Sequence, residues 1–133
     1  MDKLAILVNS IRTPDGTVLT SYDRHDYVAH TDTVTGEFYM TDGGIDYMRR
    51  SINVVPAEDL SVYSDASHDV ARQAVTWGTR GKDGLQPFKR IAVKDMETSH
   101  IEAVLYTQFR IYPQVKAVMI NELKHRGVEH EES

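Results

Sequence analysis

The sequence contains no cysteine and no long apolar run. The lack of cysteine excludes disulfides, thiol catalysis, thiolate zinc sites and iron–sulfur clusters. No window approaches the roughly 18 apolar residues that a membrane span needs, and the apolar run near the N-terminus is too short for a signal peptide. These absences predict a cytoplasmic protein without a membrane partner.

Net positive charge is also lacking. Fifteen Lys and Arg residues against twenty Asp and Glu residues give a formal net charge of −5. An acidic chain has little non-specific attraction for nucleic acid, so nucleic acid is a disfavoured partner. The length of 133 residues suits one domain, and 41% hydrophobic with 26% charged residues is typical of a globular protein.

The first half of the sequence favours β-structure. An apolar run over residues 4–11 is followed by a Thr-Pro-Asp-Gly turn at residues 13–16 and by a second predicted strand over residues 17–22. A further hairpin is predicted over residues 27–40, and a brief strand over residues 60–63.

Helical patterns lie between and after these strands. Asp42 can cap a short helix over residues 45–52, where three apolar residues recur at helical spacing. Ser64, Asp65 and Ser67 are the cap candidates for a second helix that runs through Trp77. A strand over residues 88–93 is predicted to follow.

The C-terminal third predicts a helical hairpin. Ser99 and Glu102 have the spacing of a capping box, which opens a helix that ends near Gln108. Pro113 suits the first turn of the last helix, and Gly127 suits the position just after that helix ends.

These patterns predict one α+β domain over residues 1–133, with antiparallel β-hairpins and three to four helices. It should be β-rich over residues 1–63 and helix-rich over residues 64–127, with a short acidic tail at residues 128–133.

Four neighbouring residues suggest metal ligands: His25, Asp26, His30 and Asp32. A strand would place His30 and Asp32 on one face. Imidazole and carboxylate bind zinc or iron, but at least three such groups must converge. A polar hairpin face with a turn-forming Asp explains the same residues, so the sequence predicts no metal, no cofactor and no catalytic residue.

A glycine-rich loop over residues 78–84 suggests an anion site. Its three glycines let backbone amides approach a phosphate, and Arg80 and Lys82 supply positive charge. A P-loop, however, follows a strand and opens a helix, whereas here a predicted helix precedes the loop and a strand follows it. A tight turn with exposed charges is therefore the favoured interpretation.

The segment over residues 42–50 combines glycines, tyrosine and two arginines. Arg49 or Arg50 could bind a phosphate at a helix N-terminus. Exposed tyrosine and arginine also suit a protein interface, where both are enriched. The candidate binding residues from both segments are Asp46, Tyr47, Arg49, Arg50, Trp77, Arg80 and Lys82.

Several stretches carry a resemblance to a known group of proteins. They are Arg24-His25-Asp26-Tyr27, DGGIDYMRR at residues 42–50, WGTRGKDG at 77–84, KDM at 94–96, HIEAVL at 100–105 and NELKHR at 121–126. Together they resemble a family of small uncharacterised proteins encoded by tailed bacteriophages.

The resemblance implies a phage accessory protein that acts in the host cytoplasm. It favours a non-enzymatic interaction protein that binds a host or phage protein and modulates host processes or defence. One alternative is a nucleotide-binding or nucleotide-sequestering protein that uses residues 78–84, and another is a metal-dependent phosphohydrolase or nuclease. A homo-oligomer is left open, because the C-terminal helices could also pair across a two-fold axis.

Overall fold

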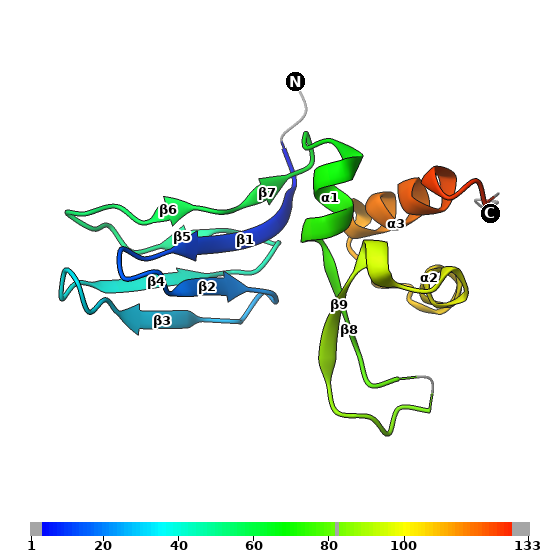
Figure 1. Cartoon of the computed structure of the whole chain (residues 1–133), viewed down its shortest axis with the longest axis horizontal. Coiled ribbons are helices and arrows are strands. Elements are labelled where there is room, and N and C mark those ends of the chain that lie inside the picture. The colour runs from blue at the N-terminus through cyan, green and yellow to red at the C-terminus, as the bar shows by residue number, and fades with distance from the viewer. Residues whose placement is uncertain (1–3, 82, 129–133) are drawn as a thin grey trace. The chain divides into compact units, whose positions relative to one another are not determined.

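The structure, a computed structural model, describes residues 4–81 and 83–128. It divides into two compact units, Met1–Asp65 and Ala66–Ser133 (Figure 1). Among the described residues, the regular elements of the first unit are all strands, and the second unit has three α-helices and a two-stranded sheet, so the predicted α+β class is confirmed. The prediction of a single domain stays a prediction, and residues 129–133 of the expected acidic tail lie outside the described residues. None of the described helices is long and apolar enough to span a membrane.

The first unit is built from two antiparallel sheets. Its strands are β1 (Ile6–Arg12), β2 (Val18–Ser21), β3 (Val28–Thr31), β4 (Phe38–Asp42), β5 (Arg49–Arg50), β6 (Glu58–Asp59) and β7 (Val62–Tyr63). One sheet has the order β2-β1-β6, with β7 also paired to β1, and the other has the order β3-β4-β5. The two predicted hairpins are confirmed as β1–β2 and β3–β4, and the strand predicted over residues 60–63 is reduced to β7.

Apolar and polar contacts join these sheets. Ile11 of β1, Leu19 of β2 and Tyr39 of β4 form a buried cluster. Asn9 of β1 is also fully buried, and its side-chain amide donates 3.0 Å hydrogen bonds to the backbone carbonyls of Asp42 and Gly44. A buried amide that satisfies its hydrogen bonds in this way fixes the register of the elements it joins.

The helix predicted over residues 45–52 is wrong. Gly43 and Gly44 have positive φ angles of 92° and 55°, and they turn the chain back as soon as β4 ends. The chain then returns as β5, which pairs with β4 through Arg49 opposite Asp42. Arg49 and Arg50 both pair with residues of β4, and this pairing favours a strand over a helix. Ile52, which was expected on the buried face of the helix, is fully exposed.

The second unit packs helices α1 (His68–Ala74), α2 (Thr98–Thr107) and α3 (Pro113–His125) with the hairpin β8 (Thr76–Thr79) and β9 (Lys89–Ala92) and the 3-10 turn η1 (Val93–Asp95). Its core residues are Ala71, Val75, Val93, Met96, Ile101, Val104, Val115, Val118, Met119, Ile120 and Leu123. The α2–α3 pair matches the predicted helical hairpin, and β9 matches the strand predicted over residues 88–93.

The ends of these helices test the predicted caps. Of the three cap candidates, Ser67 is the one whose side chain caps α1. Pro113 is the first residue of α3, and Gly127 follows α3 with a positive φ of 75°. The Ser99 capping box is wrong, because Ser99 lies inside α2 and the residue that caps this helix makes no side-chain cap hydrogen bond. Helix α1, which was predicted to run through Trp77, ends at Ala74, because the chain from Thr76 onward pairs with β9.

Candidate functional site

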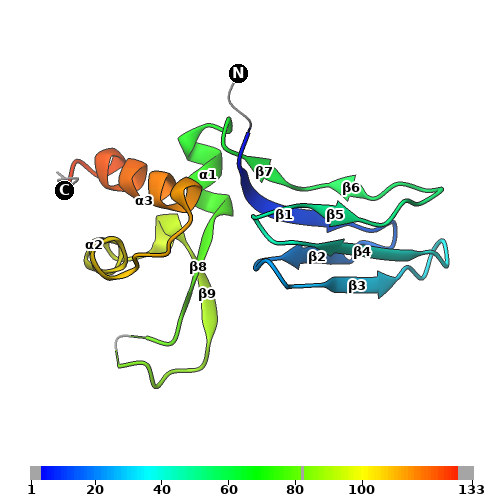
Figure 2. The same ribbon diagram turned by 180° about the vertical axis from the view of Figure 1, so that it is seen from behind.

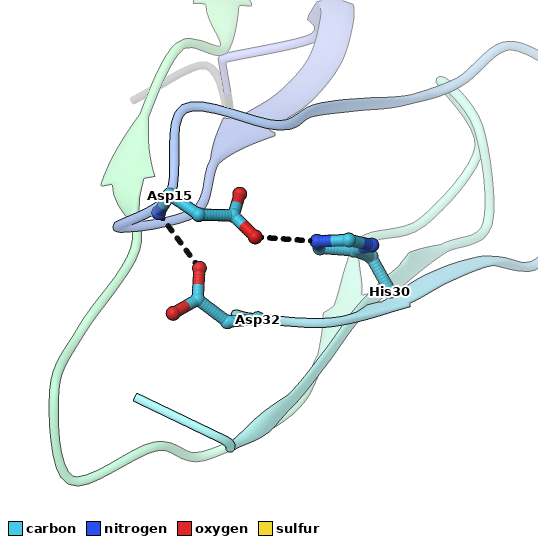
Figure 3. A group of neighbouring side chains, drawn as sticks. All are labelled: Asp15, His30 and Asp32. Carbon is cyan, nitrogen blue, oxygen red and sulfur yellow. Dashed lines mark hydrogen bonds and ion pairs between the residues drawn. The ribbon is translucent and has the colours of Figure 1, made fainter. Parts of the chain in front are cut away.

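Three titratable side chains converge where the β1–β2 and β3–β4 turns of the first unit meet. One ligand atom from each of Asp15, His30 and Asp32 lies within 4.8 Å of the others, the only such group among the described residues. Figure 3 shows the Asp15 carboxylate facing the His30 imidazole, and the Asp32 carboxylate facing the backbone nitrogen of Asp15. This geometry makes the cluster the first candidate for a metal or catalytic site.

Hydrogen bonds from both turns surround the Asp15 carboxylate. His30 Nε2 donates to Asp15 Oδ2 at 2.7 Å, and the Thr33 amide donates to the same oxygen at 2.8 Å. The Thr13 hydroxyl and the Thr17 amide donate to Oδ1 at 2.7 and 2.9 Å. Asp15 thus closes its own turn and holds the neighbouring one.

Asp32 performs the reciprocal role from the β3–β4 turn. Its side chain is buried, and its Oδ1 accepts a 2.7 Å hydrogen bond from the Asp15 amide. Its Oδ2 accepts from the amides of Val34 and Thr35 at 3.0 and 2.7 Å. The two aspartates therefore lock two turns together through backbone amides.

Both carboxylates are held in their charged form. The pKa of Asp15 lies far below its usual value, because Thr17 and His30 donate hydrogen bonds to the anion. Burial raises the pKa of Asp32, but hydrogen bonds from the amides of Thr35 and Asp15 outweigh burial and leave that pKa lowered. A metal ion would have to displace donors that already satisfy these oxygens, so the geometry fits a structural clasp better than a metal centre.

The structure brings together only some of the residues that the sequence suggested as ligands. His30 and Asp32 meet, whereas Asp26 accepts a 2.9 Å hydrogen bond from the Tyr22 amide in its own turn, and His25 is outside the cluster. The sequence did not single out Asp15 as a ligand, because the Thr-Pro-Asp-Gly turn already accounts for an aspartate at this position.

The candidates in the first unit also have structural partners. Arg49 pairs with Asp42 at 2.8 Å, although its side chain is 65% exposed. The Asp46 carboxylate lies 3.9 Å from the guanidinium of Arg24. Tyr47, the next residue after Asp46 in sequence, is exposed. These residues lie on the tight turn and on β5 rather than on a helix, so the anion site that a helix N-terminus would provide is absent from this segment.

Arg50 is a cross-link inside the first unit. Its guanidinium donates to Asn9 Oδ1 at 3.0 Å and to the Ser61 hydroxyl. Its other nitrogens donate to Thr41 Oγ1 at 3.2 Å and to Asp59 Oδ1 at 3.1 Å. The partners come from several strands, and they use the donors that ligand binding would need.

The other candidates lie on the β8–β9 hairpin of the second unit. Figures 1 and 2 show this hairpin extending away from the helices of the same unit. Trp77 is half-buried on β8, and Arg80 is exposed just after that strand. Lys82 lies outside the described residues.

An aromatic ring organises one face of the hairpin. Phe88 lies over Gly78, and the Arg80 guanidinium carbon lies 5.9 Å from the ring centroid. This cation–π pair leaves the Phe88 residue 56% exposed, and Leu85 at the tip is 83% exposed. We use the name hairpin surface for Arg80, Leu85, Phe88 and Lys89, of which Lys89 neighbours Arg90 on β9 and so lies on the face of the sheet opposite Gly78 and Phe88.

Several described amides in and just after the glycine-rich loop already form hydrogen bonds. Hydrogen bonds within the hairpin use the amides of Gly81, Gly84, Leu85 and Gln86. Binding in a glycine-rich loop requires such amides to point at the ligand. Nucleotide binding by residues 78–84 therefore stays a prediction from the sequence.

A second buried charge cluster holds the helices of the second unit. Glu122 of α3 has no exposed side-chain surface, and Arg72 of α1 binds it with two nitrogens at 2.7 and 2.9 Å. Arg126 and His68 contact the same carboxylate at 2.7 and 2.9 Å.

Hydrogen bonds from Arg72 lower the pKa of Glu122 to about 2, with smaller contributions from Arg126 and His68 that act against burial. No motif in the sequence predicts this cluster. The one sequence feature that indicates it is the position of Glu122, which lies seven residues after Val115 and therefore on the apolar face of α3.

Comparison with protein-family models, curated proteins and solved structures finds no match to this chain.

Proposed function

We propose that this protein is a non-enzymatic interaction protein, and that the hairpin surface binds its protein partner. The observation that carries the proposal is the exposure of Leu85 and Phe88 on a hairpin that extends from the rest of its unit. Exposed apolar groups gathered with arginine are typical of protein-binding surfaces.

The charges of the hairpin surface support the same function. Within residues 4–81 and 83–128, neither Arg80 nor Lys89 forms a salt bridge, whereas Arg49 and Arg50 both do. Arg80 and Lys89 therefore keep their charges available to a partner. Arg80 is also held beside Phe88, so less side-chain entropy is lost when it is bound.

The resemblance to proteins of tailed bacteriophages extends the proposal to a biological setting. The protein would then be an accessory factor in the host cytoplasm, where it binds a host or phage protein and modulates host processes or defence. The partner is searched for in a bacterial lysate, with and without phage infection.

Affinity capture with variant baits tests this proposal. The first bait is the whole protein, and the second carries Leu85→Glu and Phe88→Glu. A protein recovered in stoichiometric amount by the first bait should be lost with the second, because two charges replace the apolar contacts.

The matched control carries Ile52→Glu and Val54→Glu, which change two exposed apolar residues of the first unit in the same way. This bait should capture the partner like the unmodified protein. Equal capture by the hairpin variant, or recovery of no partner at all, would count against the proposed function. Circular dichroism and thermal unfolding of each bait establish that the variants are folded.

A further inference from the structure

The hairpin has a charge opposite to that of the whole chain. Residues 76–92 contain four basic residues, Arg80, Lys82, Lys89 and Arg90, and one acidic residue, Asp83, a net charge of +3 within a chain of net charge −5. Charge complementarity selects binding partners and speeds their encounter. The hairpin is therefore suited to an acidic partner.

The hairpin also has open backbone edges. In the described part of the chain, β8 and β9 pair only with each other, and they form a two-stranded sheet. The outer edge of β8 thus offers backbone groups that a third strand could pair with, although the Arg90 side chain already donates to the Thr76 carbonyl at 3.2 Å. Proteins that bind extended peptides commonly use such edges, with main-chain hydrogen bonds for affinity and side chains for specificity.

We infer that the hairpin binds an extended, acidic segment of its protein partner, which adds to an open edge of the β8–β9 sheet. The inference rests on the proposed function and names the chemistry of the partner. Side chains of an added strand alternate between the two faces of the sheet. Its apolar side chains would contact Phe88 on the face that carries Gly78 and Leu85 at the tip, and its glutamate or aspartate side chains would lie beside Lys89 on the opposite face. Arg80, just beyond the end of β8, would attract the acidic charge of the same segment.

The aromatic residues favour a peptide over single-stranded nucleic acid. Proteins that bind single strands stack successive bases on several rings. On the described hairpin only Phe88 is an exposed ring, whereas Trp77 is half-buried. Trp77 also neighbours Gly78 on β8, so it faces away from the side of the sheet on which Phe88 packs.

Fluorescence anisotropy with defined probes tests the inference. The main probe is a labelled peptide of about ten alternating Glu and Val residues, long enough to span a typical strand. The control probes are the Lys and Val counterpart, the Glu and Val peptide with N-methyl groups on alternate amides, and a labelled oligothymidine. All 133 residues of the chain are present in every assay.

The acidic peptide should bind, and its affinity should fall as salt is added. The Lys peptide should bind at least about tenfold more weakly because its charges are reversed. N-methylation should cause a similar loss, because it removes the amide hydrogens that a strand edge needs. Equal binding of the N-methylated and unmodified acidic peptides would overturn the strand addition.

Two charge-matched variants locate the site. Arg80→Glu with Lys89→Glu should weaken binding of the acidic peptide by about tenfold or more. Arg110→Glu with Lys116→Glu changes the net charge by the same amount at two exposed positions outside the hairpin and should weaken it far less. Equal losses in both variants would show that net charge alone attracts the peptide, and would overturn the assigned site.

The remaining outcomes separate this inference from the proposed function. Tighter binding of oligothymidine than of the acidic peptide would make the hairpin a nucleic-acid surface and overturn the inference. Failure of the acidic peptide to bind, combined with hairpin-dependent capture of a protein from lysate, would overturn the inference and leave the proposed function standing. Failure of both experiments would remove both.

Discussion

The ring of Phe88 fills the space that a side chain at Gly78 would need. A Cβ atom on Gly78 would lie 2.7 Å from two carbon atoms of the ring. The absence of a side chain on β8 thus allows the aromatic residue to pack across the hairpin, where Arg80 lies beside it. A glycine inside a strand that is otherwise β-branched and aromatic often marks such a close approach.

Gly78→Ala should therefore clearly reduce partner binding while changing the free energy of unfolding only slightly. The new methyl group would push the Phe88 ring outward, and that ring can move because it is half-exposed. We expect a loss of stability of no more than about 1 kcal/mol, together with a clear loss of partner capture. Thermal unfolding and affinity capture measure the two effects, and unchanged capture would contradict the role given to this ring.

Arg49 and Arg50 should respond very differently to substitution. Arg50→Ala removes the donor that links Asn9, Thr41 and Ser61, and it should cost roughly 2–3 kcal/mol of unfolding free energy. Arg49→Ala removes one largely exposed ion pair and should cost less than about 1 kcal/mol. Urea denaturation of both variants checks the difference. Similar losses would show that the Arg50 network contributes little.

Acid should destabilise the second unit through Glu122. Its pKa is about 2 in the folded protein and 4.5 in the unfolded chain. The stability that the anion contributes is therefore complete above about pH 4.5 and is lost as the pH falls toward 2. Unfolding followed from pH 6 down to about pH 2 should show this loss.

Glu122→Gln provides the matched comparison for that experiment. It should lower stability at neutral pH by roughly 3 kcal/mol, because two arginines lose the charge that pairs with them. It should also reduce the dependence of stability on pH between about 4.5 and 2. A variant that keeps the full acid dependence would assign it to other carboxylates, of which Asp15 is the first candidate.

The stability contributed by the cluster of Asp15, His30 and Asp32 should not depend on metal ions. Because hydrogen-bond donors already satisfy both carboxylates, added Zn²⁺ or a chelator should leave the melting temperature unchanged. Asp15→Asn should lower the melting temperature, because the two turns lose their charged acceptor. A rise in melting temperature with Zn²⁺ that disappears in Asp15→Asn would instead establish a metal site.

Local sequence signals predicted the hairpins and the last helix well. The turn before Gly16, Pro113 at the start of α3 and Gly127 after its end each depend on the backbone preferences of one residue type, and all three are found. Asp42 and Ser99 also fit helix caps in sequence. Asp42 instead belongs to β4 and pairs with Arg49 of β5, and Ser99 lies inside α2, which begins earlier than predicted. Local preference is weaker than tertiary contact at such positions.

The candidate site was harder to predict than the fold. Arg80 and Trp77 were named from the glycine-rich loop, but Leu85 and Phe88 were not, because exposure cannot be read from a sequence without an alternating pattern. Arg50 was named for its charge, yet its partners lie 9 to 41 residues away in the chain. Contacts at that separation follow from the three-dimensional fold.

Hydrogen exchange of the hairpin in the bound protein tests the central claim most directly. The amides of residues 76–92 would be compared between the protein alone and the protein saturated with the partner recovered by affinity capture. Our account predicts slower exchange in β8 or β9 and around Leu85, because a bound strand covers an open edge. Slower exchange confined to the first unit, with residues 76–92 unchanged, would contradict it.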